Sequence, residues 1–150
     1  MTTLYLVSCV SRKRSVPCEA RDLYISDWFS YARRYVEKQK QPWFILSTIH
    51  GLVHPTQRLE PYDMEGRGMR RVPYLHRIAW AQQVFVQLEP HLPVDRIVFY
   101  AGFYYREFLA PMLLRNAGQV EVPLADMGIG EQKHWFAQSL LESLFTRRSV

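Results

Sequence analysis

The apolar run Leu4-Tyr5-Leu6-Val7, followed at once by the polar segment Ser8-Cys9-Val10-Ser11-Arg12-Lys13-Arg14, decides the fold prediction. The apolar run is short and has no helical period, so it predicts a buried β-strand. The polar segment predicts a loop that leaves the carboxyl end of this strand. A strand that runs directly into hydroxyls, a thiol and three cations is typical of α/β proteins that carry their functional loops at strand ends.

The same pattern recurs three times along the chain. Further strands are predicted at Trp43-Phe44-Ile45-Leu46, Arg96-Ile97-Val98-Phe99-Tyr100 and Val120-Glu121-Val122. Between and after them we expect four helices. The first begins near the N-cap residue Ser26, and the others cover residues 72–88, 104–116 and 131–146. Gly118 is expected to end the third of these helices as a C′ glycine. The core-facing residues of the helix over 72–88 are expected to be Leu75, Ile78, Ala79, Val84, Phe85 and Leu88.

Strict alternation of strands and helices predicts a parallel sheet, because each parallel strand needs a crossover helix on a face of the sheet. Right-handed crossovers leave few topologies. We therefore expect a single α/β domain over residues 1–150, a three-layer α/β/α sandwich with a four-stranded parallel sheet in the order 2-1-3-4. The topological switch point would lie between strands 1 and 3, where open parallel sheets bind ligands.

Composition and cysteine content narrow the class of protein. Hydrophobic residues make up 48% of the 150 residues and aromatic residues 14%, which is enough for a core and argues against a disordered chain. The two cysteines form no CxxC pair and lie near no histidine cluster, so we expect no metal site and no cofactor. No apolar run approaches the roughly 18 residues of a membrane span, and the N-terminus resembles no signal peptide. A cytoplasmic protein without membrane contact is expected, while the oligomeric state stays open.

Positive charge is concentrated in the first half of the chain. Residues 1–77 hold thirteen Lys or Arg against seven Asp or Glu, whereas residues 78–150 hold six against seven. Such an asymmetry favours a polyanionic partner, here a nucleic acid or a nucleotide. The alternative is an ordinary basic surface.

The loop after the first strand is the first candidate ligand-binding segment. Ser8 and Ser11 offer hydroxyl donors beside the cation Lys13, a combination that suits a phosphate group. Cys9 lies between them and is counted with these candidates, although a thiol at a strand end commonly packs as a small hydrophobe. The structural alternative is that these side chains only stabilise a turn. The loop has no phosphate-binding glycine motif of nucleoside triphosphate or dinucleotide sites.

Two segments after the second strand supply candidate catalytic groups. His50 precedes Gly51 and has a near-neutral intrinsic pKa, which suits proton donation. In Glu60-Pro61-Tyr62-Asp63 a proline stiffens two carboxylates and a phenol. We assign carboxylate chemistry to Asp63 and ligand contacts to Glu60 and Tyr62. The alternatives are a structural histidine and a loop anchored by salt bridges to Arg58 or Arg70.

The loops after the third and fourth strands complete the predicted site. Gly102 permits close approach of a ligand to a helix start, Tyr104 or Tyr105 would stack on a base, and Arg106 would contact phosphate. Glu107 is a second candidate carboxylate. The segment Gly128-Ile129-Gly130-Glu131-Gln132 repeats the arrangement, with Gly128, Gly130 and Gln132 as candidate ligand-binding residues. Either tyrosine could instead belong to the core.

At these residues the chain resembles a small, largely uncharacterised family of bacterial and phage domains. The resemblance rests on Leu6-Val7-Ser8-Cys9 with Lys13, on Ser47…His50-Gly51-Leu52, on Glu60-Pro61-Tyr62-Asp63, on Ala101-Gly102…Tyr105-Arg106, and on Pro123-Leu124-Ala125 with Gly128 to Gln132. It extends remotely to uracil-DNA-glycosylase-like folds and to a core domain of archaeosine synthases, which handle nucleobases. The water-activating Asp or Asn that the glycosylases carry near their first strand has no carboxylate counterpart here before Glu19.

This resemblance implies a nucleobase- or nucleic-acid-directed protein that hydrolyses or exchanges an N-glycosidic bond in DNA or in a modified nucleotide. The catalytic set would be His50, Asp63 and Glu107. The alternative is a non-catalytic nucleotide- or nucleic-acid-binding module of a stress or phage-defence system, and an exposed pair Trp28 and Phe29 on the first helix would favour action through a partner.

Overall fold

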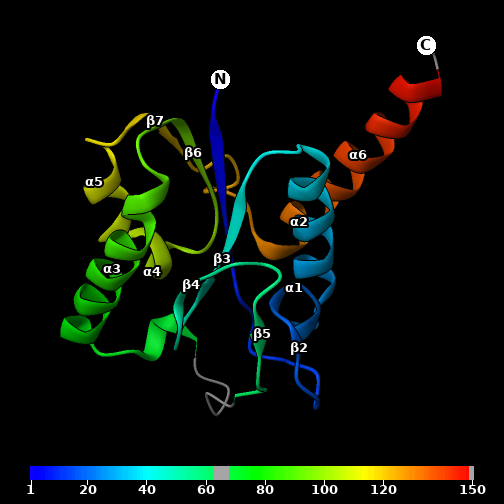
Figure 1. The fold of residues 1–150 in the computed structure, drawn as a ribbon. Coiled ribbons are helices and arrows are strands. Elements are labelled where there is room, and N and C mark those ends of the chain that lie inside the picture. Colours follow the sequence, from blue (N-terminus) through cyan, green and yellow to red (C-terminus); the bar gives the residue numbers. More distant parts are fainter. Residues whose placement is uncertain (63–67, 149–150) are drawn as a thin grey trace.

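The computed structural model describes residues 1–62 and 68–148, with side chains as far as residue 145. Its centre is a five-stranded sheet in the order β4-β3-β1-β6-β7 (Figure 1). Four of these strands are parallel and match the four predicted ones: β1 (Thr3–Ser8), β3 (Trp43–Ser47), β6 (Val94–Tyr100) and β7 (Ala117–Glu121). Their arrangement, 2-1-3-4 in predicted numbering, places the switch point between β1 and β6.

A fifth strand makes the sheet mixed, so the prediction of a purely parallel, four-stranded sheet is wrong. The extra strand, β4 (Gly51–Val53), pairs antiparallel with β3 through a tight turn. Gly51 permits this turn because its φ of 72° is a conformation that residues with a Cβ rarely adopt. A separate small sheet joins β2 (Cys18–Glu19) to β5 (Arg58–Leu59). Strands this short leave little alternation in a sequence.

Helices cover both faces of the sheet. On one face lie α2 (Asp27–Lys38) and α6 (Ile129–Arg148), which pack together, with α1 (Ala20–Leu23) beside them. On the other face lie α3 (Tyr74–Leu88), α4 (Phe103–Arg106) and α5 (Leu109–Leu113). Short 3₁₀ turns occupy Met69–Arg71 and Glu89–His91. The result is the predicted three-layer α/β/α arrangement.

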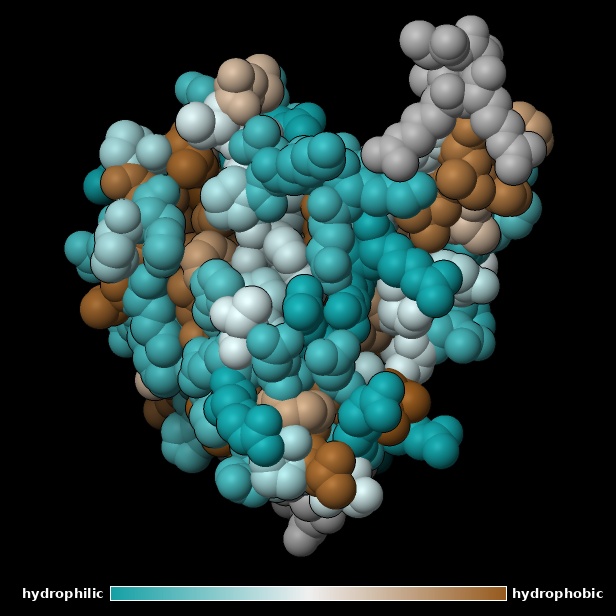
Figure 2. All heavy atoms as spheres, turned by 45° about the vertical axis from the view of Figure 1, so that its right-hand side comes forward, coloured by the Kyte–Doolittle hydropathy of each residue, from teal (hydrophilic) through white to brown (hydrophobic). Residues whose placement is uncertain are grey.

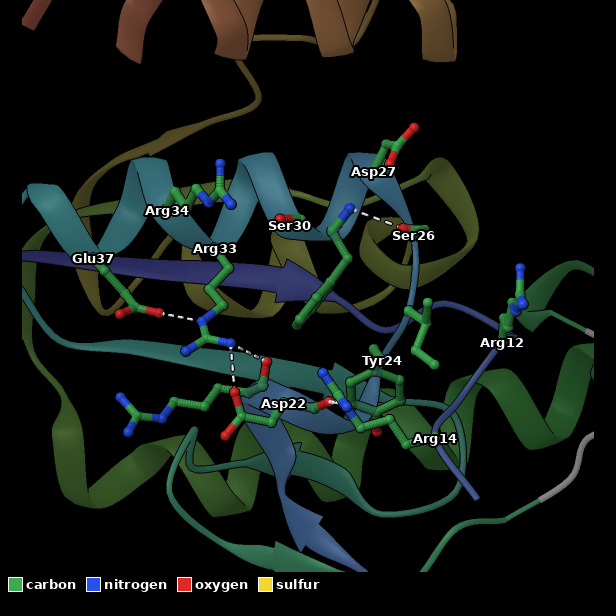
Figure 3. Close-up of a pocket in the computed structure, with 13 residues that line it drawn as sticks. Arg12, Arg14, Asp22, Tyr24, Ser26, Asp27, Ser30, Arg33, Arg34 and Glu37 are labelled. Atoms are coloured by element: carbon green, nitrogen blue, oxygen red, sulfur yellow. Dashed lines mark hydrogen bonds and ion pairs between the residues drawn. The ribbon is translucent and has the colours of Figure 1, made fainter. Parts of the chain in front are cut away.

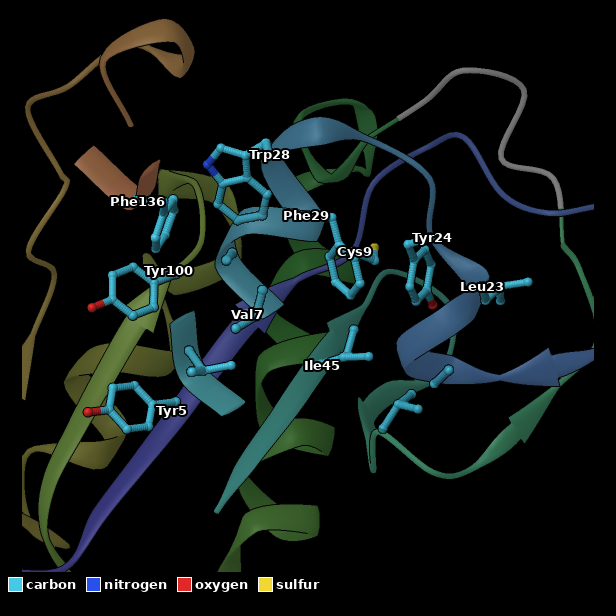
Figure 4. Close-up of a cluster of buried hydrophobic side chains, with 14 of the residues drawn as sticks. Tyr5, Val7, Cys9, Leu23, Tyr24, Trp28, Phe29, Ile45, Tyr100 and Phe136 are labelled. Atoms are coloured by element: carbon cyan, nitrogen blue, oxygen red, sulfur yellow. The ribbon is translucent and has the colours of Figure 1, made fainter. Parts of the chain in front are cut away.

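Alternate residues of the central strands feed two separate cores. Val7, Ile45 and Tyr100 face α2 and α6, whereas Leu6, Leu46 and Phe99 face α3 and α5. Figure 4 shows the first core, where the side chains of α2 lie over β1 and β3. Trp28 and Phe29 are buried there, so the first long helix does not present them to a partner. Ser26 caps α2 as predicted, since its Oγ accepts a hydrogen bond of 2.9 Å from the Phe29 amide.

The helix predicted over residues 104–116 is two short helices instead, and the role predicted for Gly118 is wrong. Pro111 lies in the first turn of α5, where its missing amide hydrogen is tolerated, and it cannot donate to the carbonyl of Glu107, so the helical hydrogen bonds are interrupted between α4 and α5. Gly118 belongs to β7. A Cβ there would lie 2.9 Å from the carbonyl oxygen of Asp95, so the close approach of two strands explains the glycine.

The face that α3 buries also differs from the prediction. Leu75 is 73% exposed and Ala79 is exposed, whereas Trp80 and Ala81 are buried. The indole nitrogen of Trp80 donates a 2.8 Å hydrogen bond to the carbonyl of Ser47, which ties α3 to the end of β3. Apolar residues occur nearly all round this helix, so the sequence did not determine its inward face.

Exposed apolar side chains gather at the C-terminal part of α6, where Leu141, Leu144 and Phe145 lie at the surface. Figure 2 shows this patch at the upper right, while hydrophilic residues cover the middle of the same view. No helix in the described part of the chain is both long and apolar enough to cross a membrane.

Candidate functional site

Three loops that follow different strands meet at the carboxyl edge of the sheet. Cys9 follows β1, Thr48 follows β3 and Tyr105 lies in α4 beyond β6. The Cys9 Sγ lies 3.5 Å from the Tyr105 hydroxyl and 3.6 Å from the Thr48 Oγ1, and the two hydroxyls are 3.1 Å apart. We call Cys9, Thr48 and Tyr105 the hydroxyl–thiol cluster. Segments far apart in the sequence thus converge beside the switch point.

Tyr62 joins this edge to the loop after β1. Its hydroxyl lies 2.8 Å from the Ser47 Oγ and 2.6 Å from the Tyr24 hydroxyl. Ser47 is fully buried and also accepts a 3.1 Å hydrogen bond from the amide of His50. The Lys13 ammonium lies 4.2 Å from the centre of the Tyr62 ring, within reach of a cation–π interaction.

The phenols at this edge are neutral at physiological pH. Burial raises the pKa of Tyr24 to about 12. Burial is also the main cause that raises the pKa of Tyr62 and of Tyr105 above the usual tyrosine range, and the nearby Cys9 adds to it. These side chains therefore act as hydrogen-bond donors and acceptors and not as anionic bases.

The open space at the cluster is small. A cavity of about 20 Å³ lies among Cys9, Lys13, Thr48, Tyr62 and Tyr105, with Val10, Ser11 and Gly68 completing its wall. A cavity of this size holds about one water molecule. The arrangement can thus hold a water or a small polar atom of a ligand among residues that carry five hydroxyl or thiol groups and one cation.

The predicted catalytic residues lie in different surroundings. The His50 ring packs edge-on against Tyr62 at a centroid distance of 5.1 Å, at the margin of the cluster. Glu107 is turned toward α3, where its carboxylate accepts a 2.7 Å hydrogen bond from the Nε of Arg77. Asp63 lies outside the described residues. The structure brings His50 to the edge of the cluster and pairs Glu107 elsewhere, and the catalytic roles stay predictions.

The predicted ligand-binding residues also lie in different surroundings, and not all of them are at the hydroxyl–thiol cluster. Ser8 is buried, whereas Ser11 and Glu60 are exposed. Tyr104 lies beside Arg77, whose guanidinium carbon is 5.1 Å from its ring centre, away from the hydroxyl–thiol cluster. Near the start of α6 two glycines are exposed and Gln132 is partly buried. Gly102, Arg106 and Gln132 line a second cavity at the ends of β6 and β7.

A long groove on the α1–α2 side of the molecule is the feature that the sequence reasoning missed. It has a volume of about 720 Å³, and five arginines line it against three carboxylates: Arg12, Arg14, Arg21, Arg33 and Arg34 against Asp22, Asp27 and Glu37. Figure 3 shows Arg33 reaching from α2 toward Asp22, with Arg14 beside Tyr24. We call this feature the arginine groove.

Part of the positive charge in the arginine groove is uncompensated. Arg33 donates to Asp22 at 2.8 Å and to Glu37 at 2.5 Å, which uses two of the three carboxylates. Arg14 donates to the backbone carbonyl of Asp22, an uncharged acceptor. The side chains of Arg12 and Arg34 form no hydrogen bond or ion pair with any residue that the structure describes. The groove therefore attracts anions.

Backbone pairing builds the wall of the groove that comes from the loop after β1. The Arg14 amide donates to the carbonyl of Leu23, and the Ile25 amide donates to that of Arg12, each at 2.9 Å. The loop thus runs alongside α1 and opposite α2. The sequence showed the charge excess of this half of the chain and the runs at residues 12–14 and 33–34, but not the pairing that assembles them.

No group of three or more His, Cys, Asp or Glu side chains is placed to hold a metal ion in residues 1–62 and 68–145. Comparison with protein families matches residues 4–138 to a family of unknown function, DUF6884. Because the match covers most of its length, the chain belongs to this family, in agreement with the predicted membership of an uncharacterised domain family. No match was found among curated proteins or among solved structures.

Proposed function

We propose that this DUF6884 protein binds nucleic acid, with the phosphate backbone in the arginine groove. The observation that carries the proposal is the arginine groove itself, in which Arg12 and Arg34 have no anionic partner among the described residues. Arginine donates in a fixed fork that matches phosphate oxygens, and such contacts supply most of the sequence-independent affinity for nucleic acid. The +5 net charge and the basic first half of the chain support the same partner.

The hydroxyl–thiol cluster supports a base-directed part of this proposal. Tyr24 belongs to the wall of the arginine groove, and its hydroxyl bonds that of Tyr62, which lines the small cavity at the sheet edge. One hydrogen bond between these two phenols therefore links the lining of the groove to that of the small cavity. A strand held in the groove would pass close to neutral donors and to Lys13, the chemistry that recognises the polar edge of a base. We also propose that the fold is related to uracil-DNA-glycosylase-like folds.

The test is a titration of fluorescently labelled single- and double-stranded DNA, with fluorescence anisotropy read across a salt series. Wild-type affinity is expected to fall steeply as salt rises. The double variant Arg12→Gln/Arg34→Gln should bind more weakly and lose a slope of about 0.7–0.9 in log K against log salt for each contact removed. The matched control is Arg115→Gln, an exposed arginine in the turn between α5 and β7. Weak binding with no salt dependence would reject the proposal.

A second candidate function is hydrolysis or exchange of an N-glycosidic bond. It is favoured by the position of His50, whose ring lies against Tyr62 at the margin of the cluster. A histidine there could donate a proton to a departing base. Among residues 1–62 and 68–145, none that lines the small cavity carries a carboxylate to stabilise a cationic sugar. Nucleic-acid binding is therefore the better supported function.

This second function is tested by incubating the protein with oligonucleotides that carry normal and modified bases and measuring free base by chromatography. Release of a base that is lost in His50→Ala and kept in His76→Ala would establish the activity, since His76 is exposed on α3. Binding of DNA without release of any base would reject this second function and support nucleic-acid binding only.

A further inference from the structure

The cavity at the carboxyl ends of β6 and β7 differs in character from the two features above. Its volume is about 230 Å³, and both polar atoms and apolar side chains line it. Its lining includes Val122, Leu124 and Met127, together with Gly102, Phe103 and Arg106. Sites for drug-sized ligands run from about 300 to 1,000 Å³, so this cavity suits a group the size of one nucleobase, with any attached sugar and phosphate outside it.

Gln132 stabilises the cavity from within the protein. Its Oε1 accepts a 2.8 Å hydrogen bond from the indole of Trp28, and its Nε2 donates to the carbonyl of Met127 at 2.9 Å and to that of Leu124 at 3.4 Å. The amide is fully used in these bonds, so Gln132 holds the 124–127 loop against α2. The wall is thus formed before any ligand arrives, which lowers the entropic cost of binding.

Arg106 and Phe103 give the border of the cavity a specific chemistry. The Arg106 Nε donates to the carbonyl of Ala101 at 3.0 Å, and its terminal nitrogens bond no atom in the described part of the chain. Its guanidinium carbon lies 5.9 Å from the centre of the Phe103 ring, which is 57% exposed. Asp126 is the nearby carboxylate, and it attracts Arg106 without a hydrogen bond to it in this structure.

We propose that this cavity binds a single nucleotide, with the base in the cavity against Phe103 and the phosphate on Arg106. An exposed aromatic ring beside a small cavity of mixed polar and apolar lining favours a nucleobase, because its planar ring can stack and its edge can bond polar atoms. A guanidinium fixed through its Nε presents its remaining donors to an anion in one orientation. The space beside Gly102 is open, since a Cβ at this position would meet no atom within 4 Å.

The inference rests on the proposed function for the class of ligand, but it uses residues outside the arginine groove. The same chemistry could come from a free nucleotide or from the 5′-terminal nucleotide of a strand. Both carry a base and a phosphate at the same spacing. The experiment separates these two sources.

The test is a ¹H–¹⁵N NMR titration of the full chain with adenosine monophosphate, adenosine and inorganic phosphate. Adenosine monophosphate is expected to shift the signals of the Gly102 amide, the Arg106 Nε–H and the Trp28 indole N–H. Arg106→Gln should weaken its binding at least tenfold, and Phe103→Ala should weaken adenosine monophosphate and adenosine alike. Phe103 is a second, exposed position in case Arg106→Gln disturbs the fold, and Arg115→Gln is the control that should bind as the wild type does.

Several results would overturn the inference: no shifts with adenosine monophosphate, shifts confined to the arginine groove, equal affinity for inorganic phosphate, or unchanged binding by folded Arg106→Gln. Tighter binding of a 5′-phosphorylated tetranucleotide than of adenosine monophosphate would assign the cavity to strand ends, and equal affinity would assign it to free nucleotides. A strand that binds while adenosine monophosphate does not would reject this inference alone. Binding of adenosine monophosphate without binding of a strand would reject only the proposed role of the arginine groove.

Discussion

Hydrogen bonds between side-chain hydroxyls connect the loops at the sheet edge, and the Tyr62 hydroxyl makes two of them. Replacing Tyr62 by Phe removes the group that bonds both Ser47 and Tyr24 and leaves a partly buried phenol short of a partner. We expect a loss of about 1–2 kcal/mol in the free energy of unfolding, measured by urea denaturation. The control Tyr74→Phe removes an exposed hydroxyl and should change stability by less than about 0.5 kcal/mol. Equal stability of the two variants would show that the hydroxyl chain contributes nothing.

The same phenols predict a loss of stability in alkali. The folded pKa of Tyr24 is raised to about 12 by burial, from an ordinary value of 10.0. Between these two values the folded state holds a proton that the unfolded state releases, so stability is fully present below pH 10 and falls as the pH rises toward 12. Urea denaturation at a series of pH values should show this fall. Tyr24→Phe should make it shallower, and a flat profile would contradict the burial of these groups.

At the scale of residues, the sequence predicted some of the side chains that lie together but not the contacts that each of them makes. It named Cys9, Tyr62, Tyr105 and Lys13, which the structure gathers around one small cavity. It could not anticipate that Arg77 pairs with Glu107, because the partner lies 30 positions away. The exposure of Phe103 was not predictable, since an apolar residue among tyrosines gives no signal of exposure, which the packing of α4 decides.

Among the elements, the β3–β4 hairpin depends on one backbone conformation. Gly51 has a φ of 72°, and a Cβ at this position would lie 2.5 Å from the Oε1 of Gln87. Gly51→Ala should cost about 1–3 kcal/mol, because alanine is strained at positive φ and Gln87 must move from its bond to the Leu52 amide.

The matched control for that hairpin is Gly130→Ala in α6. A Cβ there meets no atom within 4 Å, and alanine favours a helix over glycine by about 1 kcal/mol. We expect the melting temperature to fall for Gly51→Ala and to stay or rise for Gly130→Ala. A Gly51→Ala protein as stable as the wild type would mean that the turn does not require glycine.

Elements with strong patterns were predictable and marginal ones were not. The four parallel strands and the cap at Ser26 follow from apolar runs and from a side chain that satisfies a free amide. The strands β2, β4 and β5 contain two or three residues each, and tertiary pairing defines them. Pro111 was the available signal for the break between α4 and α5.

At the scale of the whole molecule, the parallel order follows from alternation and crossover handedness, so sequence fixes where functional loops gather. The arginine groove does not follow in this way. It needs the loop after β1 to pair with residues 23–25 and α2 to lie opposite, a contact that charge counting cannot reveal. Its arginines outnumber its carboxylates five to three, and the proposed function uses this positive charge to attract a polyanion.

The most direct test of the central claim is to map where a nucleic acid touches the protein. A ¹H–¹⁵N NMR titration with a short single-stranded oligonucleotide would follow the arginine Nε–H signals and the backbone amides. The account predicts the largest shifts at Arg12, Arg14 and Arg34 and at Ser30, with smaller shifts as salt is raised. Shifts confined to the α3–α5 face, or no shifts at low salt, would contradict it.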